Sequence, residues 1–175
     1  MVKKASHLDL KIKCNMKITN NSNRDIKEIS EMMESFYPFA KKRLDFDQEP
    51  TAVFESDPQN AENALGKTAH YEPASMTITV YVDGRHPKDI MRSFSHELVH
   101  HAQNCAGEFD NMGEVGEGYA QADEHLRNME KDAYLRGNMC FRDWEDNYKN
   151  NNWSFHKSLN ERKERLFYKL TKKLW

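Results

Sequence analysis

Residues 95–101 read Ser-His-Glu-Leu-Val-His-His and lie in a segment whose apolar residues recur at helical spacing. Four residues are slightly more than one helical turn, so His96 and His100 project from the same face of the helix. Two imidazoles on one face can bind one zinc ion at about 2.0–2.1 Å. The stretch therefore predicts a buried helix that carries two ligands of a metal centre.

Glu97 follows the first histidine and lies about 100° further round the same helix. Its carboxylate is then beside the metal without joining the two imidazoles in direct coordination. A carboxylate in that place can take a proton from a metal-bound water and pass it to a leaving amine. We therefore interpret Glu97 as a general base and acid in zinc-dependent hydrolysis.

The segments before the motif predict an α+β fold with a small mixed sheet. Residues 76–82 alternate apolar and polar side chains, as in a half-buried strand, and are expected to pair with residues 67–71 in a hairpin. Residues 51–54 predict a further short strand. Pro87 suits the first turn of the motif helix, where a backbone N–H needs no partner.

Helices are predicted before and after this region. Residues 22–44 have apolar side chains at helical spacing, and Pro38 is expected to kink or end that helix. A glutamate-bearing helix is expected from about residue 119 to residue 136, with Gly137 as its stop. Residues 154–175 predict a basic C-terminal helix.

The length of 175 residues predicts one domain over residues 1–175, with its motif-bearing core at about residues 67–137. Hydrophobic residues make up 38% and charged residues 31% of the chain, against typical values of about 45–50% and about 25%. This composition indicates a modest core surrounded by polar helices.

Charge and cysteine content indicate which binding partners and which cellular compartment to expect. The ends of the chain, residues 1–17 and 154–175, are basic, and we interpret them as solvated helix faces in preference to a nucleic-acid-binding surface. The three cysteines are widely spaced, which indicates neither a disulfide framework nor a cysteine-based zinc site. No apolar stretch approaches the ~20 residues that cross a bilayer. We expect a cytoplasmic protein with no membrane partner.

A catalytic zinc has a third protein ligand in addition to the two histidines. The metzincin pattern does not supply it, because Gln103 and Ala106 stand where that pattern requires Gly and His. A downstream carboxylate is the natural alternative. The candidates are Glu114, Glu117, Glu124 and Glu130, with His125 as a further alternative.

Residues 128–134, which read Asn-Met-Glu-Lys-Asp-Ala-Tyr, resemble the glutamate helix of gluzincin metallopeptidases, where Glu-x-x-Ala follows the His-Glu-x-x-His helix. The resemblance extends over about residues 67–137 and is nearest to minimal gluzincins and to small phage-encoded metallopeptidases. It implies a compact zincin-like domain, Zn²⁺ as the cofactor and Glu130 as the third ligand, ahead of Glu124. It also implies that the strand at residues 76–82 forms the edge of the cleft.

The function that we expect is hydrolysis of peptide bonds in a peptide or protein, by an endopeptidase in preference to an exopeptidase, with the substrate paired to the cleft-edge strand. A phage origin would place the protein in the host cytoplasm or in the virion. One alternative is a non-catalytic zinc-binding module with a structural or virion-associated role. Another is a SprT-like nucleoprotein-associated protease, which the basic ends favour but whose third ligand is a histidine.

Further side chains near the motif have roles that the sequence leaves open. Tyr119, His125 and Tyr134 are candidates for stabilising an oxyanion, although core packing is the preferred interpretation of Tyr134. His101 adjoins the second ligand but points about 100° away from it, so a surface or indirect role is preferred over metal binding.

Overall fold

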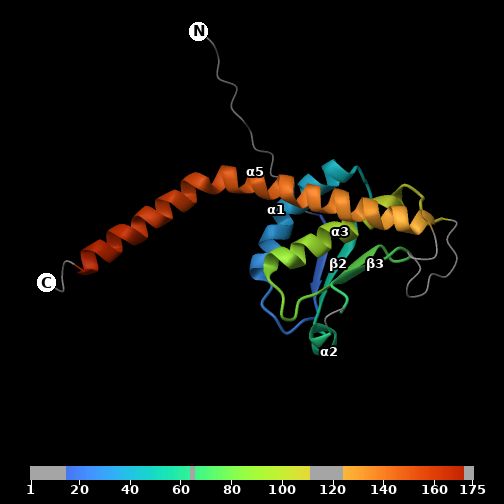
Figure 1. Cartoon of the computed structure of the whole chain (residues 1–175), viewed down its shortest axis with the longest axis horizontal. Helices are drawn as coiled ribbons and strands as arrows, with labels where there is room; N and C mark the ends of the chain where they lie inside the picture. Colours follow the sequence, from blue (N-terminus) through green and yellow to red (C-terminus); the bar gives the residue numbers. More distant parts are fainter. Residues whose placement is uncertain (1–14, 64–65, 111–123, 172–175) are drawn as a thin grey trace, which may run out of the picture. The chain divides into compact units, whose positions relative to one another are not determined.

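The computed structural model describes residues 15–63, 66–110 and 124–171, with side chains as far as residue 148. These residues form an α+β fold with a small mixed sheet, as predicted. In chain order the elements are β1 (Lys17–Asn20), α1 (Lys27–Leu44), β2 (Thr51–Glu55), α2 (Pro58–Glu62), β3 (Ala69–Glu72), β4 (Thr77–Tyr81), α3 (Pro87–Cys105) and α5 (Glu124–Thr171) (Figure 1).

The chain divides into two compact units, Met1–Phe141 and Arg142–Trp175. The first contains all four strands and the predicted metal ligands. In the second, α5 extends to Thr171 and so includes much of the basic helix expected at the C-terminus. Among the described residues, no helix is both long and apolar enough to cross a membrane. The single domain expected over the whole chain stays a prediction.

The sheet has the strand order β1-β2-β4-β3. β1, β2 and β4 run parallel, and β3 pairs with β4 in the antiparallel hairpin that the sequence predicted. Because β4 is paired on both sides, the expectation that residues 76–82 form the edge of the cleft is wrong. β3 occupies the edge instead, since the long-range parallel pairing of β2 with β4 covers the other side of the hairpin.

One face of the sheet is buried under the helices. Ala52 lies opposite Ile78 and Phe54 opposite Val80, and all four side chains are fully buried. α3 packs against β3, β4 and α1. Each large apolar side chain that is fully buried stabilises the fold by about 1.5–3 kcal/mol relative to exposure. This packing fixes the position of α3 against the sheet.

α1 begins at Lys27 and continues to Leu44, so it does not end at Pro38 as one reading of the sequence suggested. Phe36, Tyr37 and Ala40, which flank the proline, are all buried. A proline inside a helix costs about 3 kcal/mol because one backbone hydrogen bond is lost. Burial of the flanking side chains outweighs that cost.

α3 begins at Pro87, as predicted. His86 caps the helix, since its Nδ1 accepts a hydrogen bond from the Lys88 backbone N–H at 3.2 Å. Buried side chains recur in α3 from Ile90 to Gln103. The motif helix is therefore held along its length, which fixes the direction in which its histidines point.

Candidate metal centre

The motif helix brings the two predicted histidine ligands together. His96 and His100 lie one turn apart on α3, and their Nε2 atoms are 3.2 Å apart. Glu130 reaches them from α5, with Oε2 at 3.3 Å from Nε2 of His96 and Oε1 at 3.4 Å from Nε2 of His100. The three side chains form a group of donor atoms contributed by two helices that are distant in the sequence.

The size of this group suits a tetrahedral zinc ion. Bonds of about 2.0–2.1 Å that meet at tetrahedral angles place neighbouring ligand atoms about 3.3–3.4 Å apart. The contacts between the three side chains measure 3.2, 3.3 and 3.4 Å, the two from Glu130 through different oxygens, and one donor atom from each residue lies within 4.8 Å of the others. His96, His100 and Glu130 could therefore hold one zinc ion and leave a fourth position for a water or a substrate.

The charges of the group also suit a cation. Hydrogen bonds from His100 and His96 hold the pKa of the Glu130 carboxyl far below its usual range, so this side chain is ionised. Burial opposes a charge on His100, but Glu130 and Glu97 outweigh burial and raise the pKa of its imidazole. A carboxylate that favours a proton on the neighbouring imidazole of His100 marks a place where a metal cation can replace that proton.

Gln103 supports this group, and the sequence reasoning missed it as a functional residue. The side chain is only 2% exposed, and its Oε1 lies 2.8 Å from Nδ1 of His100. An amide oxygen only accepts hydrogen bonds, so Nδ1 carries a proton, and a metal would bind at Nε2 after that nitrogen has released its own proton. Gln103 Nε2 donates to the backbone oxygen of Met129 at 3.1 Å and to Asp132 Oδ2 at 3.3 Å.

Gln103 thus joins one ligand helix to the other. Met129 directly precedes Glu130, so the hydrogen bond to its carbonyl fixes the turn of α5 that carries the predicted third ligand. Partners of this kind orient metal-binding histidines and set their tautomer. The signal in the sequence was a polar residue three positions after His100, which places it near the same face of the helix.

Glu97 lies at the wall of the site and is 7% exposed. Burial raises the pKa of its carboxyl, and the nearby Glu130 acts in the same direction, whereas positive charge on His100 and His96 opposes the shift. A hydrogen bond from the Tyr71 backbone N–H also acts on this carboxylate. A carboxyl with a raised pKa is a better proton acceptor near neutral pH than an ordinary glutamate.

A pocket of about 460 Å³ opens onto the ligand group. Residues 67–71, in and just before β3, form one wall, and side chains of α3 and of α5 between Leu126 and Asn138 form the others. Glu97 and the three predicted ligands all line it. The predicted catalytic and metal-binding side chains therefore face the same space, beside the edge strand of the sheet.

Small residues allow the two ligand helices to approach. Gly137 was expected to end the glutamate helix, but α5 continues through it, so that prediction is wrong. A Cβ atom at Gly137 would lie 3.0 Å from Cα of His96 and 3.1 Å from the backbone oxygen of Ser95. Ser95 Oγ donates to the Gly137 carbonyl oxygen at 2.8 Å, and Ala133 is fully buried. Close helix packing, not chain termination, explains this glycine.

Of the other side chains considered as metal ligands or as oxyanion donors, those that the structure describes lie outside the ligand group, and one of them, Tyr134, is more exposed than expected. Glu124 and His125 are exposed and are not members of the ligand group, while Glu114, Glu117 and Tyr119 lie outside the described residues. Tyr134 was expected in the core, but its side chain is 64% exposed, and its ring centroid lies 4.6 Å from that of His96. That expectation is wrong because residue 134 is one turn after Glu130 and so faces the pocket.

Comparisons of the chain with protein family models, with curated proteins and with solved structures find no match. The gluzincin resemblance of residues 128–134 therefore stays a prediction. The support for a function comes from the geometry of the ligand group and its pocket.

Proposed function

We propose that this protein is a zinc-dependent metallopeptidase, with His96, His100 and Glu130 as the metal ligands and Glu97 as the general base. The observation that carries this proposal is the group of three donor side chains, joined by contacts of 3.2–3.4 Å, beside a buried glutamate on the same helix. A bound zinc ion would supply a Lewis acid that activates a water and polarises the scissile carbonyl.

The protein side chains perform the proton transfers in this proposal. The Glu97 carboxylate accepts a proton from the attacking water and delivers it to the leaving amine. Its burial keeps competing solvent away from that proton. We propose that Tyr134, which lines the pocket next to His96, donates a hydrogen bond to the developing oxyanion.

We propose that the substrate is an extended peptide that pairs with β3. Among the described strands, β3 pairs with β4 alone, and residues 67–71 line the pocket. An unpaired strand edge offers backbone N–H and C=O groups to a peptide, which then adds one strand to the sheet. Pairing along an edge accommodates chain on both sides of the scissile bond, which favours an endopeptidase over an exopeptidase.

The experiment that tests the function is hydrolysis of a peptide library by the zinc-loaded protein, with and without a chelator. We expect cleavage that the chelator abolishes and that added zinc restores. Glu97→Gln is the decisive variant, because it keeps the size of the side chain and all three ligands but removes the base. It should retain one zinc ion while turnover falls by about two to four orders of magnitude.

Two results would contradict the proposal. Unchanged turnover in Glu97→Gln would remove this residue from the mechanism. Zinc binding at full stoichiometry with no cleavage of any library peptide would instead favour a structural zinc-binding module. A SprT-like site is less compatible with the ligand group, because the histidine on α5 nearest to Glu130 in sequence, His125, is exposed and outside the group.

A further inference from the structure

We propose that His101 is a positioning residue that holds β3 in register with the motif helix and so with the candidate metal centre. The proposal rests on the peptidase function proposed above, since it assigns a role in that site. His101 directly follows the ligand His100, yet its side chain is fully buried. The imidazole lies between two aromatic rings, with centroids 4.9 Å from Phe46 and 5.5 Å from Tyr71.

The hydrogen bonds of His101 identify which of its two ring nitrogens carries the proton. Its Nε2 lies 3.0 Å from the backbone oxygen of Gln48, and a carbonyl oxygen only accepts, so Nε2 carries the proton. Nδ1 is then the acceptor in a neutral ring, and the Tyr71 hydroxyl, 3.0 Å away, donates to it. Burial lowers the pKa of His101 and raises that of Tyr71 to about 12, in agreement with two neutral partners.

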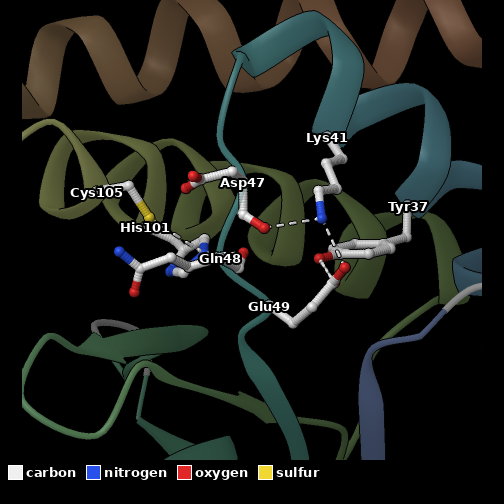
Figure 2. Close-up of polar contacts among 7 residues, drawn as sticks. All are labelled: Tyr37, Lys41, Asp47, Gln48, Glu49, His101 and Cys105. Carbon is white, nitrogen blue, oxygen red and sulfur yellow. Dashed lines mark hydrogen bonds and ion pairs between the residues drawn. The ribbon is translucent and has the colours of Figure 1, made fainter.

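The series of hydrogen bonds from Gln48 through His101 to Tyr71 is anchored to α1 at its Gln48 end. Figure 2 shows Lys41 and Tyr37 reaching from α1 to the segment that contains Gln48. Lys41 Nζ donates to the backbone oxygen of Asp47 at 3.0 Å and pairs with Glu49 Oε1 at 2.6 Å, while the Tyr37 hydroxyl donates to Glu49 Oε2. Both sequence neighbours of Gln48 are therefore tied to α1, which holds the Gln48 carbonyl in place beside His101.

At its other end, the series of hydrogen bonds reaches the pocket through Tyr71. The Tyr71 hydroxyl accepts a hydrogen bond from Asn104 Nδ2 at 2.8 Å, and the same amide donates to the backbone oxygen of Pro73 at 3.1 Å. Two residues of α3, His101 and Asn104, thus hold the side chain of Tyr71. Because Tyr71 lies in β3 and lines the pocket, His101 sets the distance between the edge strand and the motif helix.

The test uses substitutions that remove hydrogen bonds and keep aromatic volume. His101→Phe removes the hydrogen bonds of the imidazole to Tyr71 and Gln48 and its contact with Cys105 Sγ, and Tyr71→Phe removes only the hydroxyl. Tyr81→Phe on the neighbouring strand β4 is the matched control. Each zinc-loaded protein is compared in thermal stability, zinc affinity and amide hydrogen exchange of residues 69–72, and in kcat and KM for peptides of increasing length built around one cleavage site.

We expect zinc affinity to stay near that of the wild type in all variants, because none of the ligands is altered. In His101→Phe and Tyr71→Phe, exchange of residues 69–72 should become about tenfold faster, as expected for the loss of a buried hydrogen bond. The gain in kcat/KM with peptide length should also diminish. The double variant should lose little more than either single variant, because each substitution removes the hydrogen bond between His101 and Tyr71. Tyr81→Phe should behave as the wild type.

The proposal is overturned if both variants lose thermal stability while exchange of β3 and the length dependence are unchanged, because His101 is then only a core residue. If His101→Phe fails to fold, Tyr71→Phe decides the question alone. If the wild-type protein cleaves no peptide, the peptidase function fails, and the exchange measurement still decides whether His101 holds β3.

Discussion

The histidine pair of the motif depends on side chains outside the motif. His100 is oriented by Gln103, whose amide also bonds to the backbone of α5 beside Glu130. A ligand held in one tautomer loses less entropy on binding, and the metal then meets a lone pair that already points at it. At the scale of single residues, the proposed metal affinity should therefore depend on Gln103 as well as on the two histidines.

Replacement of Gln103 by leucine tests this role. Gln103→Leu keeps an approximately equal volume but leaves Nδ1 of His100 without its acceptor, so we expect zinc affinity to fall about 10–100-fold. The measurement is competition against a chelator of known zinc affinity. Gln59→Leu is the matched control, because Gln59 is exposed on α2. Equal zinc affinity in Gln103→Leu and wild type would show that Gln103 serves packing alone.

Acid should weaken zinc binding at a pH set by His100. Its pKa is raised above the ordinary value of 6.5, because Glu130 and Glu97 outweigh the effect of burial. A proton on Nε2 excludes the metal, so zinc affinity should fall as pH drops through this raised pKa, while Glu130 remains ionised. Zinc affinities measured at intervals between about pH 8 and pH 5 locate the pH below which the apparent affinity begins to fall. An onset below the ordinary imidazole value of 6.5 would contradict the assigned contacts.

At the scale of the elements, patterns within short stretches of sequence predicted the features that depend only on neighbouring residues. The hairpin of β3 with β4, the short strand β2 and the start of α3 at Pro87 follow from alternation and turn residues that are adjacent in sequence. Pro38 and Gly137 were misread, because the rules that make them helix breakers ignore burial against other elements. Phe36 and Ala40 hold α1 together across the proline, and the approach of α3 explains the glycine.

Gly137→Ala tests the role of this close approach. The added methyl group would lie 3.0–3.1 Å from backbone atoms of Ser95 and His96, which cannot move away easily. We expect a lower free energy of unfolding by about 1–3 kcal/mol and weaker zinc binding, because α5 must shift away from α3 and carry Glu130 with it. Denaturant unfolding and zinc competition measure the two effects.

The control for Gly137→Ala is Leu135→Ala, since Leu135 lies on the same helix and is 66% exposed. This variant should leave both stability and zinc affinity close to the wild-type values. A stabilised Gly137→Ala protein with normal zinc affinity would mean that the helix propensity of alanine outweighs the contact, and that the helices do not need the glycine.

At the scale of the whole molecule, the sequence predicted the three side chains of the ligand group but did not predict the order of the strands in the sheet. His96 and His100 could be paired from their spacing, whereas Glu130 was favoured over Glu124 only through a family resemblance. The placement of β4 between β2 and β3 depends on parallel pairing of segments far apart in the sequence, which alternation alone does not reveal. The cleft edge was therefore assigned to the wrong strand of the correct hairpin.

The measurement that tests the central claim most directly is the zinc affinity of Glu130→Ala and Glu124→Ala, titrated side by side with wild type against a graded series of chelators. Glu130 lies 3.3–3.4 Å from both histidine nitrogens, and Glu124 is exposed outside the ligand group. We predict that Glu130→Ala weakens zinc binding by more than about 100-fold, whereas Glu124→Ala binds as the wild type does. Retention of zinc by Glu130→Ala, with its loss in Glu124→Ala, would contradict the account.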